Sequence, residues 1–407
     1  MHQKSRRGLI GTAVAALALT GTGVAHPAEA AQPARAAQRP PSPLTTAVGR
    51  PTGAGDVFVT PTSSAPGFVN GAQIIDKRGR TVWFHRAAAG TVDADFRSQT
   101  LHGERVLTFW EGTGLGGLAD GTDYVYDRHH KLIAKVHAGR HLTTDGHEFL
   151  LNDDGTAWVL SYDRSTADLS AIGGSDHQAV INGIVRKVDI RTGRVLFSWN
   201  SARHIRYSES YQPLPASADT PWDWFHVNAV HLDRGGRLLV DARNTWAAYR
   251  LDRHTGRVLW RLGGKRSTFR LTAARGQQLN RGGAIVAWQH DVNAVGANRY
   301  TFFDNESAGT ANTGQDADSE LDRSRTVTVR LFPKHHVARL VASNDQPDHL
   351  LASSQGNAQR LAKGRTFVGW GNLNEVSEFD RRGRLLWHAR FPTGVNSYRA
   401  YLLPWKA

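Results

Sequence analysis

The chain of 407 residues contains no cysteine. Without cysteine it can form no disulfide and no thiolate, so disulfide and thiolate chemistry are excluded. Its main apolar run, from Leu9 to Leu19, is too short to span a bilayer, which takes about 20 residues. Long amphipathic helical patterns are scarce. The sequence therefore predicts neither a stable membrane anchor nor a helical fold.

Several motifs of common enzyme classes are also missing. There is no P-loop, and no Gly-x-Gly-x-x-Gly follows a βαβ pattern, so a nucleotide sulfate donor has no phosphate cradle. Gly-x-Ser-x-Gly and a helical His-Glu-x-x-His are absent, which argues against serine hydrolases and zincins. We therefore expect no cofactor and no resident metal.

The first 30 residues have the pattern of an export signal. Lys4, Arg6 and Arg7 precede the apolar run, and the small residues Ala28–Ala30 suit a cleavage site. The paired arginines suggest the twin-arginine route, although the general secretory route stays open. Residues 31–52 are rich in Ala, Pro and Gln, which predicts a disordered linker. The mature protein is thus expected to be secreted or to stay in the cell envelope.

The chain is basic, with 50 Lys and Arg against 36 Asp and Glu and a net charge of +14. A basic protein can meet nucleic acid, an anionic envelope or small anionic substrates. The cationic residues are scattered rather than clustered, which favours the last two over nucleic acid. Solubility alone remains an alternative explanation.

Residues 53–407 show short Val, Leu and Trp runs separated by Gly and Asp turns, which predict an all-β fold. The stretch at 222–264 contains four such runs in about 40 residues, the size of one propeller blade. Similar blade endings lie at 76–84, 127–136, 189–199, 252–262, 327–341 and 380–389. We therefore predict a six-bladed β-propeller, in which the C-terminal strand completes the N-terminal blade. A two-sheet sandwich is the alternative, but the repeat length argues against it.

The first strand of each blade lines the centre of a propeller, so residues at equivalent starts converge in space. The side chains predicted to meet there are Arg97, Gln99, His147, His226, Asn228, His290, Asn293, Asn357, Gln359, Tyr398 and Arg399. Alternation along a strand predicts that His226 and Asn228 point the same way. Arg243 ends the second strand of its blade, where a turn can bring it back beside them.

Polar and cationic groups without nearby carboxylates suit an anion such as sulfate or phosphate. A neutral imidazole can also attack a sulfuryl or phosphoryl centre. Two alternatives stay open: the polar groups satisfy one another, or three histidines bind zinc. Asp304–Glu306 fit a solvated turn better than a catalytic site. Five tryptophans near the predicted opening are candidates to stack on an aromatic substrate: Trp110, Trp222, Trp224, Trp288 and Trp370.

Several motifs together resemble the arylsulfotransferase family of exported six-bladed propellers. They are "DWFHVNAV", "DARNTW", "DRHTGRVLWRLGG", "WQHDVNAV", "SQGNAQRL", "FVGWG" and "SYRAY", spread over residues 56–405. The resemblance implies transfer of a sulfuryl group from a phenolic sulfate ester to a phenol, through a sulfohistidine and without a nucleotide donor. It assigns the nucleophile to His290 and sulfuryl binding to His226, Asn228, Arg243 and His147, with His226 or His147 also as acid and base.

This chain departs from well-known bacterial members of that family in two ways. The sequence shows neither their separate N-terminal β-domain, used in dimerisation, nor their cysteine pair. We therefore place it in a divergent branch and leave the oligomeric state, the donor and the acceptor open.

Two other functions remain alternatives. The turns "DRHTGRVLW" and "DIRTGRVLF" resemble the repeats of quinoprotein dehydrogenases, although those normally have more blades and an acidic calcium site. A propeller that only binds an anionic envelope polymer through its basic surface is the third hypothesis.

Overall fold

The computed structural model describes residues 39–63, 67–115, 118–139, 141–309 and 321–405. The predicted signal peptide and residues 31–38 of the predicted linker lie outside these residues. The helical segments of the described chain are single 3₁₀ turns: η1 (Ser170–Ile172), η2 (Ser201–Arg203), η3 (Tyr207–Glu209), η4 (Arg234–Gly236), η5 (Arg243–Thr245), η6 (Pro333–His335) and η7 (Ala362–Gly364). None of these could cross a membrane.

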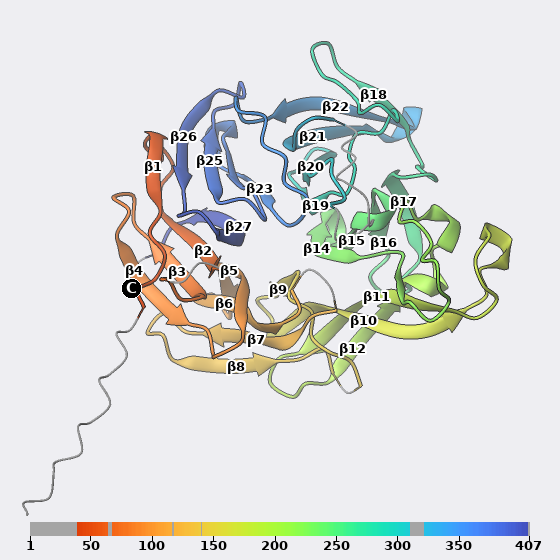
Figure 1. The fold of residues 1–407 in the computed structure, drawn as a ribbon, viewed down its shortest axis with the longest axis horizontal. Coiled ribbons are helices and arrows are strands. Elements are labelled where there is room, and N and C mark those ends of the chain that lie inside the picture. Colours follow the sequence, from red (N-terminus) through yellow and green to blue (C-terminus); the bar gives the residue numbers. More distant parts are fainter. Residues whose placement is uncertain (1–38, 64–66, 116–117, 140, 310–320, 406–407) are drawn as a thin grey trace, which may run out of the picture. The chain divides into compact units, whose positions relative to one another are not determined.

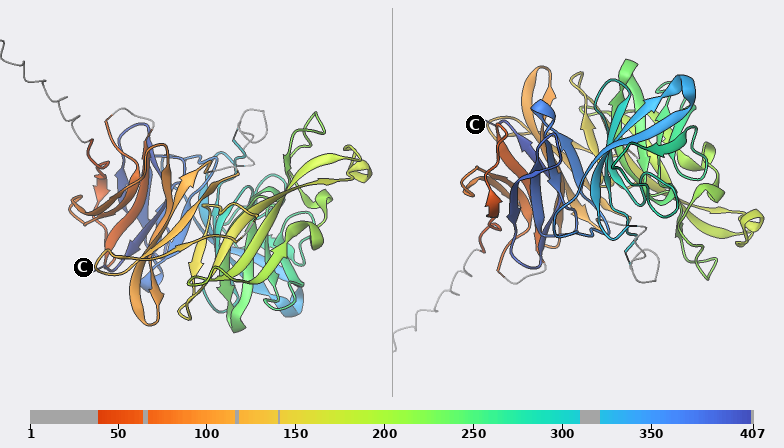
Figure 2. Two further views of the ribbon diagram at one scale, coloured as in Figure 1. Left: turned by 90° about the horizontal axis from the view of Figure 1, so that it is seen from below. Right: turned by 90° about the horizontal axis from the view of Figure 1, so that it is seen from above.

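Six antiparallel sheets are arranged as blades around a central axis (Figure 1), and Figure 2 shows them from the side. Three blades are β5 (Val92–Leu101) to β6 (Glu104–Thr113), β7 (Asp120–Tyr126) and β8 (Leu132–Val136); β9 (Phe149–Leu151) to β10 (Thr156–Ala167), β11 (Gln178–Asp189) and β12 (Val195–Asn200); and β14 (Val227–Asp233) to β15 (Arg237–Ala242), β16 (Ala247–Leu251) and β17 (Val258–Gly263). The short strand β13 (Trp222–Asp223) pairs with β11.

The remaining blades follow the same order from the centre outward. They are β19 (His290–Ala294) to β20 (Arg299–Asp304), β21 (Arg325–Phe332) and β22 (Val337–Asn344); β23 (Asn357–Arg360) to β24 (Thr366–Gly369), β25 (Glu375–Phe379) and β26 (Leu385–Arg390); and β27 (Val395–Leu403) to β2 (Asp56–Ser63), β3 (Gly71–Ile75) and β4 (Thr81–Arg86). The prediction of an all-β, six-bladed propeller is confirmed.

The last of these blades closes the ring. Strand β27 pairs antiparallel with β2, so Leu402 lies opposite Val57 although the two residues are at opposite ends of the sequence. The predicted closure by the C-terminal strand is therefore also confirmed. It satisfies backbone groups that would otherwise form an open sheet edge.

Part of the predicted linker is ordered. Residues Thr45–Gly49 form strand β1, which pairs with β26 at the outer edge of its blade, with Thr45 opposite Arg390. For these residues the prediction of disorder was wrong, because the edge of β26 offers backbone partners to a short segment containing Thr and Val. Strand β18 (Arg270–Ala273) extends another blade in the same way, parallel to β22.

The hydrophobic core consists of wedges between neighbouring blades. Six clusters of buried side chains each combine residues from two adjacent blades, as Trp199 and Trp224 do between the β9–β12 and β14–β17 blades. Burial of one such large side chain contributes about 1.5–3 kcal/mol. The innermost strands also contact their neighbours all around the ring. The polar residues at their ends are thereby held at fixed positions near the axis.

Candidate active site

Four of the predicted site residues meet where inner strands begin. His226 directly precedes β14, His290 begins β19, His147 lies two residues before β9, and Arg243 begins the turn after β15. All four are almost completely buried, with exposed fractions from 1% to 4%. The main-chain N–H of Arg243 donates to the carbonyl of His226 at 3.0 Å, which brings the turn back beside the strand start as predicted.

The three histidine rings form one cluster around His147. Its ring centre lies 5.0 Å from that of His226, in an edge-on arrangement, and 6.4 Å from that of His290, in a stacked one. Tyr162 and Tyr398 pack against His147 at 6.4 and 5.9 Å. His147 and His226 are separated by 79 positions in the sequence, and His226 and His290 by 64. The propeller geometry thus brings them together.

Two of these rings are oriented by carboxylates. Asp223 lies 2.5 Å from Nδ1 of His226, and Asp145 lies 2.7 Å from Nδ1 of His147. The expectation of a site without nearby carboxylates was therefore wrong. When Nδ1–H donates to the carboxylate, Nε2 is left with the lone pair that a general base needs. Burial lowers the pKa of His226, although Asp223 opposes this effect.

His290 is oriented by a neutral amide instead. Its Nδ1 lies 2.8 Å from Oδ1 of Asn305, whose side chain also donates to the carbonyls of Ala352 and Gln355. An N–H at Nδ1 leaves the lone pair on Nε2, which accepts a 3.2 Å hydrogen bond from the main-chain N–H of Gln355. Burial, together with Arg243 and His147, lowers the pKa of His290 well below 6.5. This histidine is neutral at neutral pH.

Asn305 belongs to a segment that the sequence reasoning assigned to a solvated turn. In the structure Asp304, Asn305 and Glu306 are completely buried, so that prediction was wrong. Asp304 forms an ion pair with Arg325 at 2.9 Å, and Asp304 Oδ1 accepts from the N–H of Ala287. The segment packs behind His290 because it continues β20, whose Phe303 pairs with His290 across the ladder.

Arg243 is a buried cation held by neutral oxygens. Its guanidinium donates to the carbonyls of Ala308 and Ser353 at 2.7 and 3.0 Å and to the side chain of Asn244 at 3.0 Å. Its Nε atom has no hydrogen-bond partner among the described residues. Burial lowers the pKa of Arg243 to about 10, although Asp223 opposes this effect. A guanidinium in this setting is suited to receive an anion.

Asn228 is buried but turns to another partner. Its amide donates to the main-chain carbonyl of Gln289 at 2.7 Å, and its own main-chain carbonyl accepts from Arg399. The register of β14 against β15 shifts between Val227 and Ala229, and His226 has a positive φ of 53°. These irregularities break the strand alternation on which the shared direction of His226 and Asn228 was based.

Two other residues predicted at the blade starts, Arg97 and Arg399, form a separate ionic cluster. Arg399 contacts Glu148 at 2.8 Å and Asp95 at 3.1 Å, and Arg97 also pairs with both carboxylates. His231 lies 3.3 Å from Glu148; burial would lower its pKa, but this carboxylate raises it to about 9. Because cations and anions are matched within this cluster, we interpret it as a support for the inner strands.

Of the five tryptophans considered for substrate stacking, Trp288 is the best placed. The guanidinium of Arg243 lies 5.0 Å from the centre of its ring, and Trp246 packs edge-on at 5.5 Å. Trp224 and Trp370 are fully buried in the wedges, and Trp110 is fully buried in a separate cluster with Tyr398. The indole N–H of Trp222 donates to the carbonyl of Gln212.

The sequence reasoning missed Asp145, Asp223, Asn305 and Gln355. The two aspartates had a local signal, since each stands two or three residues before its histidine, in "DGH" and "DWFH". Asn305 and Gln355 had none, because they reach His290 from 15 and 65 residues away.

One comparison with known proteins, the match to a family model, agrees with the motifs quoted above. The sequence model described as arylsulfotransferase (ASST) matches residues 97–392, more than half of the chain. Among solved structures, a protein of unknown function from Bacteroides caccae has 10% sequence identity, with 85% of this chain and 98% of that chain covered and a TM-score of 0.49. The β-propeller domain of Cps50 (Swd1) from Myceliophteria thermophila has 12% identity, with 87% and 90% covered and a TM-score of 0.41. No curated protein matches this chain.

Proposed function

This chain belongs to the arylsulfotransferase family, and from that premise we propose that it moves a sulfuryl group from a phenolic sulfate ester to a phenolic acceptor through a sulfohistidine at His290. The observation that carries the proposal is that a neutral, amide-oriented His290 lies within the electrostatic influence of the buried Arg243, whose described hydrogen bonds all go to neutral oxygens. One group supplies a nucleophile and the other a charge for the sulfuryl oxygens.

In the first half-reaction the lone pair on Nε2 of His290 attacks sulfur. The bond from sulfur to the phenolic oxygen breaks, and its electron pair leaves on that oxygen. Arg243 stabilises the sulfuryl oxygens, and a histidine proton neutralises the departing phenolate. His226, in its protonated form, is the better donor of this proton. Its partner Asp223 opposes the lowering of its pKa by burial and keeps 26% of its side chain exposed, whereas Asp145 beside His147 is fully buried.

The second half-reaction reverses these roles. His226, now neutral, takes the proton of an acceptor phenol, whose oxygen attacks the sulfur on His290. The bond between nitrogen and sulfur breaks and restores the neutral imidazole. Its Nδ1–H stays on Asn305 throughout, so the tautomer is ready for the next donor.

One contact must open before attack. The N–H of Gln355 donates to the same Nε2 lone pair that attacks sulfur, and Ser353, in the same turn, accepts from Arg243. Both residues are half-exposed. We propose that an arriving sulfate ester takes the place of these two contacts, so that Arg243 and the freed N–H of Gln355 then bind sulfuryl oxygens.

An aromatic group beside Arg243 supports a phenolic substrate. Tyr211 stacks on Trp246 with ring centres 3.7 Å apart, and Trp288 completes the group. We propose that the aryl ring of the donor packs against Trp288 while its sulfuryl group lies between Arg243 and His290.

The test is turnover of a chromogenic aryl sulfate with and without added phenol, followed by mass measurement of the intact protein after donor alone. We expect release that depends on phenol, and a mass increase of one sulfuryl group that maps to His290. The His290→Ala variant should lose both, whereas a control at the exposed His254, His254→Ala, should keep both. Wild-type turnover by His290→Ala would overturn the proposal, and release into water alone would indicate a sulfatase instead.

A further inference from the structure

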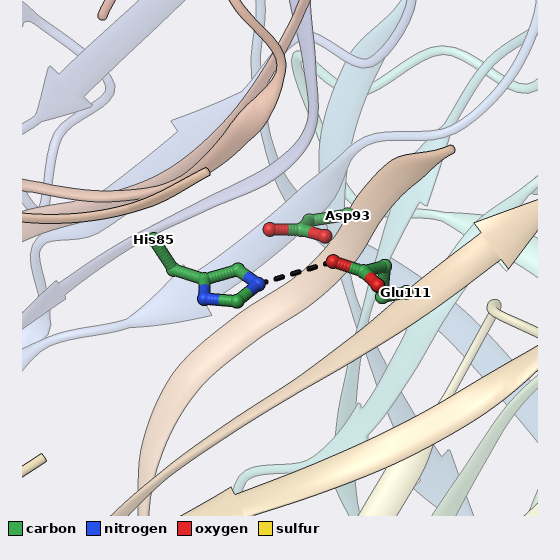
Figure 3. Close-up of side chains that lie close together, drawn as sticks. All are labelled: His85, Asp93 and Glu111. Carbon is green, nitrogen blue, oxygen red and sulfur yellow. Dashed lines mark hydrogen bonds and ion pairs between the residues drawn. The ribbon is translucent and has the colours of Figure 1, made fainter. Parts of the chain in front are cut away.

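A second group of potential ligands lies between two blades, away from the histidine cluster. His85 of β4, Asp93 of β5 and Glu111 of β6 each present one ligand atom, and all three atoms lie within 4.8 Å of one another. Figure 3 shows the three side chains pointing toward a common centre, with Nε2 of His85 3.0 Å from Oε2 of Glu111. Strand β4 ends one blade, while β5 and β6 begin the next.

Asp93 supplies an independent sign that this group binds a ligand. It is 1% exposed, and neither of its carboxylate oxygens has a partner at good hydrogen-bond geometry among the described residues, although the main-chain N–H of Ala72 and the carboxyl of Glu111 lie near it. A buried carboxylate normally accepts several hydrogen bonds, and one without partners is costly. Burial and the neighbouring Glu111 accordingly raise the pKa of Asp93 well above its usual range.

The other group of this kind in the described chain has a different balance of charge. Glu148, His231 and Asp291 also bring three ligand atoms within 4.8 Å. There, however, Arg399 lies 2.8 Å from Glu148 and 3.8 Å from Asp291, so a guanidinium already supplies the positive charge. The only ion pair described for Asp93 or Glu111 is the one between Glu111 and His85.

We propose that His85, Asp93 and Glu111 bind a divalent cation of the zinc class, which joins one blade to the next. One imidazole nitrogen with two carboxylate oxygens is a ligand set for borderline cations, with ligand distances of about 2.0–2.2 Å. Shifts of roughly 1 Å or less would bring the three atoms to such distances. The second carboxylate oxygens of Asp93 and Glu111, or water molecules, complete the coordination.

The surroundings allow an ion to enter and fix the imidazole. The side chains of His85 and Glu111 keep 24% and 12% of their surface exposed, so the site opens to solvent on one side. The His85 ring packs on Phe109, with centres 4.6 Å apart, and on Trp83 at 6.3 Å. A chain without cysteine cannot link its blades by disulfides, and a metal bridge would serve the same purpose.

The experiment uses the full chain without a histidine tag, freed of metal by a chelator. Calorimetric titration with Zn²⁺ and thermal unfolding with and without Zn²⁺ are compared for the wild type, Asp93→Asn and His177→Gln. Asparagine has the shape of a protonated Asp93, so this variant should fold. His177 is an exposed histidine beside Asp176 and controls for adventitious surface binding.

We expect one Zn²⁺ per wild-type chain and a rise in Tm on binding. Asp93→Asn should weaken binding by more than about tenfold and lose the rise in Tm, while His177→Gln should change neither. Binding of Zn²⁺ by Asp93→Asn with wild-type affinity, or no binding by the wild type, would overturn the proposal. Neither readout depends on sulfuryl transfer, so the result stands apart from that of the proposed function.

Discussion

Nδ1 of His290 lies 2.8 Å from the amide oxygen of Asn305, whereas the other two histidines of the cluster are paired with aspartates. A carboxylate opposes the lowering of a buried histidine's pKa, as Asp223 does for His226, and so suits an acid or base, while an amide fixes the tautomer without adding charge. The three rings are thus chemically distinct although they are neighbours. This difference is the basis of the division into a nucleophile and proton carriers.

The neutral state of His290 predicts the pH dependence of turnover. Because its pKa is lowered well below 6.5, the imidazole stays unprotonated and nucleophilic as pH falls through that value. The acid limb of kcat/KM for an aryl sulfate should therefore lie below pH 6.5, the ordinary pKa of histidine. Asn305→Asp should move that limb upward by about one to two pH units, because a carboxylate stabilises the imidazolium.

Asn305→Asp also removes the two hydrogen bonds that the amide donates to Ala352 and Gln355. Asn305→Ser, which loses the same donors without adding charge, is the matched control. Both variants should be slower than the wild type, but only Asn305→Asp should move the acid limb. If the acid limbs of Asn305→Asp and Asn305→Ser both coincide with the acid limb of the wild type, that limb does not report on the protonation of His290.

The pair of His226 and Asp223 predicts a dependence on the leaving group. If His226 protonates the departing phenolate, Asp223→Asn should slow phenyl sulfate by about 100-fold or more, because a poor leaving group needs a general acid. A nitrophenyl sulfate, whose phenolate leaves unaided, should slow much less. The measurement is kcat/KM over a series of donors, which reports the first half-reaction alone, with Asp176→Asn at the exposed pair as the control. An equal loss for all donors would mean that Asp223 only orients the site.

Arg243 predicts a loss that a lysine cannot repair. Its guanidinium can hold two sulfuryl oxygens in one plane, whereas an ammonium is a single point of charge. Arg243→Lys should therefore lower kcat/KM for an aryl sulfate by about 100-fold. Arg253→Lys, at an exposed position, should leave the rate unchanged. A wild-type rate for Arg243→Lys would show that sulfuryl binding does not need the planar guanidinium.

The blade count and the ring closure could be predicted because they depend on local pattern. Turns such as "DRHTG" and the alternating strands repeat along the sequence. Closure follows because the N-terminal strands have the pattern of the end of a blade, whereas the C-terminal strand has the pattern of the start of one. The meeting of His147, His226 and His290 follows from blade equivalence, and that of Arg243 from the turn after the second strand of its blade. These features need no knowledge of how neighbouring blades pack.

The remainder of the site depends on irregular backbone and on contacts between blades. Asn228 departs from strand alternation because β14 carries a register shift beside it. Asn305 is buried because the end of β20 passes behind His290, and nothing in "FFDNES" distinguishes that from a turn. Strand β1 is ordered by the free edge of β26 rather than by its own sequence.

The buried acids behind His290 give a prediction about stability. Arg325 is the one cation paired with both Asp304, at 2.9 Å, and Glu306, at 3.6 Å, among the described residues. One guanidinium cannot neutralise two buried carboxylates, so one of them holds a proton. Burial and the neighbouring Asp304 raise the pKa of Glu306 to about 11.

The sign follows from linkage. The folded pKa of Glu306 exceeds its unfolded value of 4.5, so the folded state holds a proton that the unfolded state has lost. The resulting contribution to stability is complete below pH 4.5 and declines as pH rises toward the folded pKa. Glu306→Gln cannot ionise and escapes this decline. The free energy of unfolding of the variant, relative to that of the wild type, should therefore increase by up to about 1.4 kcal/mol per pH unit. The increase is smaller where Asp304 shares the proton.

The measurement is urea unfolding of the wild type and Glu306→Gln at several pH values between neutral and mildly alkaline. Glu104→Gln, at an exposed position, is the matched control and should run parallel to the wild type. The difference in free energy of unfolding between Glu306→Gln and the wild type should increase with each step upward in pH. A constant gap would mean that Glu306 is ionised in the folded protein, and that Arg325 neutralises both acids after all.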